Sequence, residues 1–297
     1  HLYNWYDTQT LKPLNPRYVS TVDSGNMAAH LVTLQAGLAQ WKYQPVMSLP
    51  CILEGLSDTF SLLKDQLSDT RSDIVEQIAA KLSLMQRASP ADFPAGMQAL
   101  LALSVVAEQA YLPTTRVNWP ALFHQQLVDF TQEWALLFSW VTPDAPLPAD
   151  IPSLLWLAEL NLNRPGLPEK QAETAIWAAR ERMAALLELD SRLSDHASMD
   201  FRFLYYPATS LLSVGYNMDS GLLDASKYDL FPSEVRLTHY FAISTSQLPA
   251  KSWFVLGRLF TQLNNQPAVM SWSGSMFEYL MPNLVMPTWP GSLLDEM

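Results

Sequence analysis

The chain has 297 residues, of which 49% are hydrophobic and 11% aromatic, and its formal net charge is −11 at pH 7. This hydrophobic content excludes a disordered chain and is sufficient for one large domain or two ordinary ones. The negative charge, with no basic cluster in the sequence, excludes a nucleic-acid-binding protein, because phosphate backbones require a basic surface.

The sequence contains no segment typical of a membrane anchor or a signal peptide. The longest apolar run, Met97 to Ala107, is about half of the ~20 residues that a spanning helix needs, so we expect no membrane contact by this segment. The chain starts at His1 without a charged region before an apolar stretch, which indicates a cut from a longer protein. Cys51 is the single cysteine, which fits a reducing compartment. The histidines lack metal-ligand spacing, and we predict neither a metal site nor a cofactor.

The N-terminal segment precedes a first helix. The first 19 residues have the aromatic, polar and Pro-interrupted composition of an extended loop. Asp23 or Ser24 is then suited to cap a helix. The expected apolar face of this helix is a stripe at helical spacing: Met27, Leu31, Leu34, Leu38 and Trp41.

Helical patterns continue as far as residue 200, where the pattern changes to short strand-like segments. Proline supports three of the helix starts, at Pro120, Pro168 and Pro232, because it is well tolerated in a first turn. The expected elements are helices over 52–67, from a cap at Ser72, over 97–110, from Asn118 and Pro120, from Leu154 after the Pro-rich 143–152, and from Pro168; two short strands around Pro207–Ser210; a turn at 219–221; a helix from Pro232; a β-like section over 253–272; and a last helix over 274–284.

These elements predict a mostly all-α fold, with antiparallel helix pairs and short β-hairpins in the late loops. Stacked helix pairs form either an open solenoid or a closed helical barrel. No repeat of constant length is present, so the sequence favours a barrel with a cleft built by loops at one end.

Four segments combine aromatic residues with carboxylates and amides: 3–8, 20–26, 215–236 and 271–282. This mixture is typical of carbohydrate recognition, because sugar C–H faces stack on Trp and Tyr while hydroxyl groups bind planar polar groups. Glycoside chemistry additionally requires two carboxylic acids that flank the scissile bond.

Several carboxylates in these segments have two interpretations. Glu234 stands in a predicted first helical turn, where the helix dipole favours ionisation, and it is either a catalytic group or a helix cap. Glu278 lies beside Trp272, and it is either functional or one partner of a buried ion pair. Asp7 and Asp23 are candidate acceptors for sugar hydroxyl groups. Asp23 has the alternative interpretation of a helix N-cap.

Three strings at these segments resemble a known family. They are NWYDTQTLKPLNPRYVSTVDSGNMAAHLVTL, FLYYPATSLLSVGYNMDSGLLDASKYDLFPSEVRL and SWSGSMFEYLMPNLVMPTWPGSLLDE, and they resemble the glycoamylase-like domain of cyclic β-1,2-glucan synthases. The helical stretch between them carries no motif. The resemblance implies an (α/α)6 barrel, here incomplete, with residues 1–297 forming one such domain truncated at its C-terminus.

The resemblance also implies an activity and a setting. The family domain cyclises β-1,2-glucan by retaining transglycosylation, within a large membrane-bound bacterial enzyme. The implied partners are β-1,2-glucan and the glycosyltransferase and phosphorylase-like regions of that synthase, at the cytoplasmic side of the inner membrane. Alternatives are a β-1,2-glucan hydrolase of the same fold and a non-catalytic carbohydrate-binding or scaffolding helical domain.

The resemblance assigns residues as well. Ser233-Glu234-Val235-Arg236 matches a Ser-Glu-Ala-Arg-like motif, so Glu234 is expected to be the general acid/base, with nucleophile as the fallback role. The second family glutamate lies in a Gly-Ile-Ser-Glu-Ser motif that this chain lacks. We therefore expect a fragment with little transglycosylation on its own. Glu278 is a possible substitute that the resemblance does not support. The expected substrate-binding residues are Trp5, Tyr6, Asp7, Asp23, Asn26, Tyr216, Asn217, Asp229, Arg236, Trp272, Ser273 and Glu278.

Overall fold

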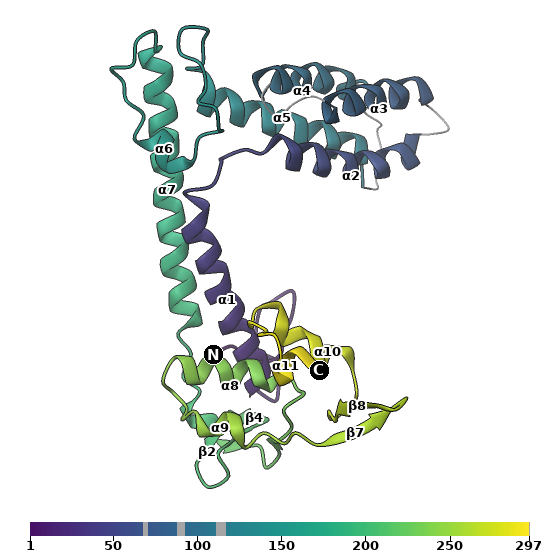
Figure 1. Ribbon diagram of the computed structural model, residues 1–297, viewed down its shortest axis with the longest axis vertical. Coiled ribbons are helices and arrows are strands. Elements are labelled where there is room, and N and C mark those ends of the chain that lie inside the picture. The colour runs from purple at the N-terminus through teal and green to yellow at the C-terminus, as the bar shows by residue number, and fades with distance from the viewer. Residues whose placement is uncertain (68–70, 88–92, 111–116, 297) are drawn as a thin grey trace. The chain divides into compact units, whose positions relative to one another are not determined.

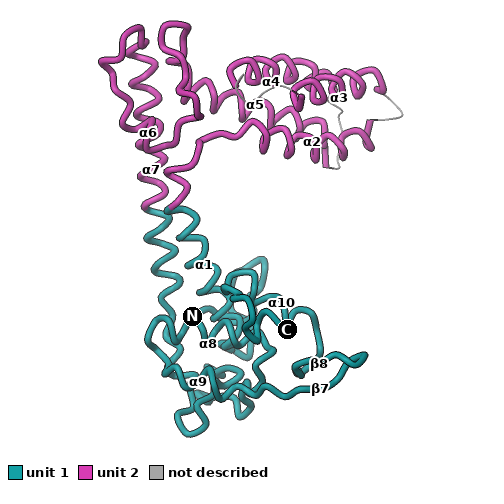
Figure 2. The backbone as a smooth tube through the Cα atoms, viewed as in Figure 1, with its two compact units in different colours: residues 1–39, 188–297 teal, residues 40–187 magenta. Residues whose placement is uncertain are grey.

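The computed structural model describes residues 1–67, 71–87, 93–110 and 117–296. Helices account for 55% of the chain, and the sheets are small and antiparallel, so the prediction of a mostly all-α fold with short hairpins is confirmed (Figure 1). No closed barrel of helices forms among the described residues. The chain divides into two compact units: residues 1–39 with 188–297, and residues 40–187 (Figure 2). The helices α1 (Thr21–Trp41) and α7 (Glu169–Ala197) each contribute to both units.

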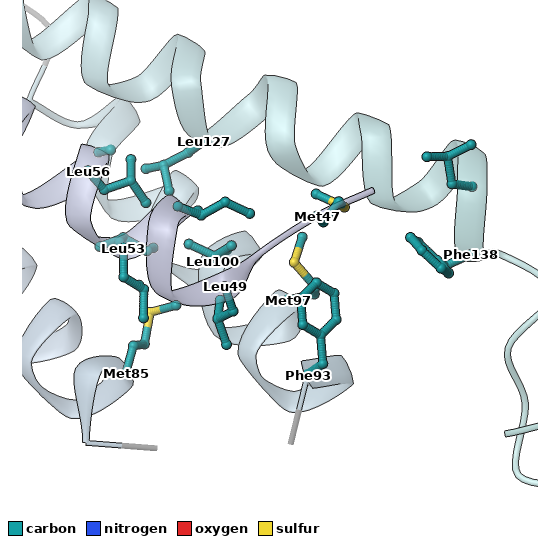
Figure 3. Close-up of a cluster of buried hydrophobic side chains, with 14 of the residues drawn as sticks. Met47, Leu49, Leu53, Leu56, Met85, Phe93, Met97, Leu100, Leu127 and Phe138 are labelled. Atoms are coloured by element: carbon teal, nitrogen blue, oxygen red, sulfur yellow. The ribbon is translucent and has the colours of Figure 1, made fainter. Parts of the chain in front are cut away.

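The unit of residues 40–187 is a packed set of amphipathic helices. It contains α2 (Leu49–Leu67), α3 (Ser72–Gln86), α4 (Phe93–Glu108), α5 (Trp119–Phe138) and the short α6 (Leu154–Ala158). Leucine, methionine and phenylalanine side chains from α2 to α5 meet in one apolar core (Figure 3). Arg182 of α7 forms an ion pair of 2.5 Å with Glu133 of α5. This unit therefore has a hydrophobic core of its own.

Helix starts in this unit follow capping chemistry at some of the expected positions. Asn118 caps α5, where its side-chain oxygen accepts a hydrogen bond of 3.1 Å from the Ala121 N–H, and Pro120 lies in the first turn as predicted. The prediction for Ser72 is wrong, because α3 already begins at this residue and Arg71 occupies the cap position without a side-chain bond.

The unit of residues 1–39 and 188–297 surrounds α1 and α8 (Val235–Ser244) with short elements. Its further helices are α9 (Lys251–Phe254), α10 (Met276–Leu280) and α11 (Leu293–Glu296), with 3₁₀ turns at Arg202–Leu204 and Met281–Leu284. Its strands are β1 (Tyr18–Ser20), β2 (Tyr205–Tyr206), β3 (Leu211–Ser213), β4 (Gly215–Asn217), β5 (Leu222–Leu223), β6 (Lys227–Tyr228), β7 (Phe260–Leu263) and β8 (Gln266–Val269).

Strand pairing fixes the N-terminal segment against the late loops. β1 pairs antiparallel with β4, so that Tyr18 lies opposite Asn217 and Ser20 opposite Gly215, and β4 pairs in turn with β5. The prediction of loop throughout the first 19 residues is therefore wrong at its end. The predicted hairpin around residues 207–210 is confirmed as β2 and β3, to which β6 adds as a third strand.

The start of α1 packs through small residues. The helix begins at Thr21, and the Asp23 N–H donates to the Ser20 hydroxyl at 3.3 Å, so neither Asp23 nor Ser24 is the cap. Gly25 lies against Thr238 of α8, where a Cβ atom at Gly25 would come 2.0 Å from the Thr238 Oγ1. The predicted apolar stripe is only partly correct: Leu38 is buried, whereas Leu34 and Trp41 are exposed. The buried face of the first turns is instead Thr21, Val22, Ser24, Gly25, Ala28 and Ala29.

Candidate functional site

The carboxyl group of Glu234 stands immediately before α8. Its side chain makes no capping bond to the helix, and the neighbouring Ser233 hydroxyl instead accepts a hydrogen bond of 3.3 Å from the Val235 N–H. Glu234 therefore occupies the cap position of α8 but does not cap the helix through its side chain. Its Oε2 accepts a hydrogen bond of 3.0 Å from the Asn26 Nδ2, which brings the start of α1 to the start of α8.

Burial and neighbouring charges favour the protonated form of Glu234. The side chain is half-buried, and this loss of solvation raises its pKa. The hydrogen bond from Asn26 lowers the pKa, while the negative charges of Asp23 and Glu278 raise it, and the net result is a pKa above the usual glutamate value. A raised pKa is the direction of shift that suits a carboxyl group to general acid catalysis.

Tyr228 lies close to Glu234 and Asp23. Burial raises the pKa of its phenol, and the negative charges of Glu234 and Asp23 raise it further, so the three groups lie within electrostatic reach of one another. Asp23 is exposed in the first turn of α1, and the Tyr228 ring lies in β6 beside Trp272 at a centroid distance of 6.2 Å. The predicted site residues did not include Tyr228, although its position next to Asp229 in an aromatic and acidic stretch was a usable signal.

Glu278 has the opposite environment from Glu234. Its carboxylate accepts hydrogen bonds from the hydroxyl groups of Ser271, Ser273 and Ser275 at 3.0, 2.6 and 3.1 Å, and from the backbone N–H groups of Ser273 and Ser275. Desolvation alone would raise the pKa of Glu278, but these hydrogen bonds outweigh it and lower the pKa to about 2. Together with Ser275, Glu278 forms a capping box at the start of α10.

Arg236 of α8 is buried in the unit of residues 1–39 and 188–297, and it binds the backbone around Glu278. Its guanidinium donates to the backbone carbonyl groups of Glu278, at 3.0 Å, and of Tyr279, and to the side-chain oxygen of Asn283 at 3.2 Å. The side chain is fully buried, and burial lowers its pKa to about 10. Glu278 therefore holds the loop of residues 271–278 in place, and Arg236 holds the end of this loop together with α10 and the turn that follows it.

This loop presents Trp272 to solvent. Its indole Nε1 donates a hydrogen bond of 3.1 Å to the Asp229 Oδ1, while 55% of the residue remains exposed. An indole whose polar edge is tethered and whose surface is exposed is suited to stack on a sugar ring. Ser273 is committed to Glu278 through both its hydroxyl and its N–H group.

The predicted site residues of the N-terminal segment 3–8 lie in two different settings. Trp5 is 54% exposed, and with Asn4 and Asp23 it lines a cavity of about 270 Å³. The Tyr6 hydroxyl accepts a hydrogen bond of 2.9 Å from the Tyr3 N–H. The Asp7 Oδ1 accepts bonds from Gln9 and Thr10 of its own turn, and these bonds lower the pKa of Asp7. Trp5 and Asp23 thus share a cavity, whereas Asp7 stabilises a turn.

The residues predicted on β4 are also engaged locally. The Tyr216 ring packs edge to face against Phe203 at a centroid distance of 5.5 Å. The Asn217 side-chain oxygen accepts hydrogen bonds of 2.9 and 3.0 Å from the N–H groups of Asp219 and Ser220, which closes the turn after β4. Among the predicted site residues, the structure thus brings together Glu234, Asn26, Asp23, Glu278, Asp229 and Trp272.

The described residues contain neither a metal-binding cluster nor a membrane-spanning helix. No group of three or more His, Cys, Asp or Glu side chains able to hold a metal ion occurs in residues 1–67, 71–87, 93–110 and 117–296. Within the same parts of the chain, every helix is too short or too polar to cross a lipid bilayer.

Comparison with known proteins bears out the resemblance to cyclic β-1,2-glucan synthases. The chain is 36% identical over 301 aligned residues to the cyclic β-(1,2)-glucan synthase NdvB of Rhizobium meliloti (strain 1021). The alignment covers 100% of this chain and 10% of the relative, so the chain spans about a tenth of the length of that synthase. No protein-family model matches the chain.

Proposed function

We propose that this chain is the carbohydrate-active part of a cyclic β-1,2-glucan synthase, that it acts on β-1,2-glucan by retaining transglycosylation, and that Glu234 is its general acid/base. The observation that carries the proposal is the similarity of the whole chain to a synthase of this name. The environment of Glu234 supports it, because the raised pKa is the property that a general acid requires.

In this mechanism, a carboxylate nucleophile attacks the anomeric carbon while Glu234 protonates the departing glycosidic oxygen. The ionised Glu234 then removes the proton from the attacking hydroxyl group of the same glucan chain, whose oxygen displaces the nucleophile and closes the ring. The two inversions give net retention at the anomeric carbon. Glu278 is poorly suited to the acid role, because the hydrogen bonds from its serines keep it ionised.

The aromatic residues give the glucan a place to bind. Trp272 is exposed, and its indole donates a hydrogen bond to Asp229. Trp5 is also exposed, and it lines a cavity together with Asp23. We place them in contact with glucose rings through their faces. As part of a larger synthase at the cytoplasmic side of the inner membrane, this segment would receive glucan from the glycosyltransferase region and share it with the phosphorylase-like region.

The test compares Glu234→Gln with wild type on linear β-1,2-glucan, both in the 297-residue chain and in the protein encoded by the full reading frame. Mass spectrometry detects ring closure, because a cyclic glucan is lighter by one water than the linear glucan of equal length. NMR of the anomeric protons reports retention or inversion. Glu173→Gln, an exposed glutamate of α7, is the matched control.

In the protein encoded by the full reading frame, we expect cyclic product from wild type and Glu173→Gln and its loss by at least about a hundredfold in Glu234→Gln, the usual contribution of acid/base catalysis. The 297-residue chain, which lacks the second carboxylate motif, should give little cyclic product in any of the three forms. Cyclisation that survives in Glu234→Gln would contradict the assigned role. Shorter linear products would identify a hydrolase, and binding without any turnover would identify a carbohydrate-binding module.

A further inference from the structure

The carboxamide of Asn26 is directed into the protein, towards Glu234. Its Nδ2 donates to the Glu234 Oε2 at 3.0 Å. Its Oδ1 is shielded from solvent and has no hydrogen-bond partner among the described residues. An asparagine that binds sugar hydroxyl groups needs its amide atoms at the surface. In Asn26, the oxygen is buried and the nitrogen is committed to Glu234.

We propose that Asn26 is a positioning residue, which holds the Glu234 carboxyl group in one orientation and does not bind the glucan. The inference rests on the proposed function in one respect, namely that Glu234 is the acid/base. The sequence predicted that Asn26 binds the substrate. The inference instead gives Asn26 the role of orienting the Glu234 carboxyl group.

The backbone of Asn26 is held firmly enough for such a role. The preceding residue, Gly25, packs against Thr238, one turn into α8 from Glu234, and only a residue without a Cβ atom allows this approach. The Thr21 hydroxyl, one turn earlier in α1, donates to the Ser213 carbonyl at 2.6 Å. The Gly25 contact therefore holds the start of α1 against α8, the Thr21 bond holds it against β3, and the two together support the Asn26–Glu234 bond.

A carboxamide suits this position because an acid/base alternates between two protonation states. The ionised carboxylate needs a donor, which Nδ2 provides, whereas the protonated carboxyl needs an acceptor, which Oδ1 provides after a half-turn of the amide plane. The negative charges of Asp23 of α1 and Glu278 of α10 act on Glu234, and the charge of Glu234 acts in turn on Tyr228 of β6. The side chain of Asn26 bonds the Glu234 carboxyl group directly, and its amide carries both a donor and an acceptor.

The experiment titrates the Glu234 carboxyl group directly by ¹³C NMR, in the 297-residue chain labelled at glutamate side-chain carboxyl carbons. The Glu234→Gln spectrum identifies the signal by its absence. Asn26→Ala removes the donor, and Asn26→Asp replaces the amide by an isosteric carboxylate. Thr33→Ala is the matched control in the same helix. It removes the hydrogen bond of 3.0 Å that the Thr33 hydroxyl donates to the Ala29 backbone carbonyl.

We expect the pKa of Glu234 to rise in Asn26→Ala, because the bond that lowers it is lost, and to rise further in Asn26→Asp, because a negative charge is added. Thr33→Ala should titrate like wild type. If Asn26→Ala fails to fold, Asn26→Leu decides the question, because it removes the donor, keeps the size of the side chain and adds no charge. A Glu234 pKa that is unchanged in the folded variants would overturn the proposal, whether or not the chain turns over glucan.

Kinetics in the full reading frame separate positioning from sugar binding. A positioning residue acts on the chemical step, so Asn26→Ala should lower kcat by about tenfold or more with little change in KM. A raised KM at unchanged kcat would assign Asn26 to the glucan and would contradict the proposal. If wild type has no activity on β-1,2-glucan, the proposed function fails, and the NMR titration still decides the role of Asn26.

Discussion

Replacing Gly25 by alanine tests the close contact on which the candidate site depends. A Cβ atom at this position would lie 2.0 Å from the Oγ1, 2.6 Å from the Cβ and 2.7 Å from the Cγ2 of Thr238, which is fully buried. Overpacking of this kind costs about 1–3 kcal/mol, whereas Gly→Ala within a helix gains about 1 kcal/mol. Since three atoms clash at once, we expect a net loss of about 2 kcal/mol.

The same helix provides the control. A Cβ atom added at Gly37 would meet no neighbouring atom within 4 Å, so Gly37→Ala should stabilise the protein through helix propensity alone. Thermal denaturation followed by circular dichroism should show Gly25→Ala lowering Tm by about 4–8 °C, since 1 kcal/mol shifts Tm by about 2–4 °C in a unit of this size. Hydrogen exchange should place the loss at α8. A Gly25→Ala protein as stable as Gly37→Ala would refute the reasoning.

Three further predictions concern the loop of residues 271–278. Arg236→Met should lower Tm, because hydrogen bonds from a charged donor contribute about 1.5–3 kcal/mol each and those of the buried Arg236 are lost, and Arg236→Lys should recover only part of the loss. The pKa of Glu278 falls from 4.5 to about 2 on folding, so its stabilisation is complete above pH 4.5 and is lost as the pH falls towards 2; the difference in Tm between wild type and Glu278→Gln should shrink across that window, and a constant difference would contradict the assigned pKa. Trp272→Ala should weaken binding of linear β-1,2-glucan in calorimetry by roughly two- to tenfold, whereas Trp177→Ala, which removes an exposed indole of α7, should not.

Local sequence signals predicted those parts of the fold that depend on neighbouring residues. The cap at Asn118, the hairpin formed by β2 and β3 and the long helix after Pro168 each follow from a few adjacent side chains. The pairing of β1 with β4 could not be predicted in this way, because Tyr18 and Asn217 are distant in the chain and neither strand is longer than three residues. The face of α1 was missed for another reason: its first turns pack through glycine, serine and alanine, which carry little signal in an apolar periodicity.

The two glutamates of the late loops show what the motifs alone could not distinguish. Both stand at a helix start in an aromatic and polar stretch, and from the sequence both are candidates for chemistry. The donors around Glu278 come from three serines within seven residues of it, so its ionisation is a local property. The partner of Glu234 precedes it by 208 residues, and its raised pKa results from burial that only the folded chain creates. A carboxylate surrounded by its own loop is suited to hold that loop, whereas a half-buried carboxyl group with one distant donor is suited to gain and lose a proton.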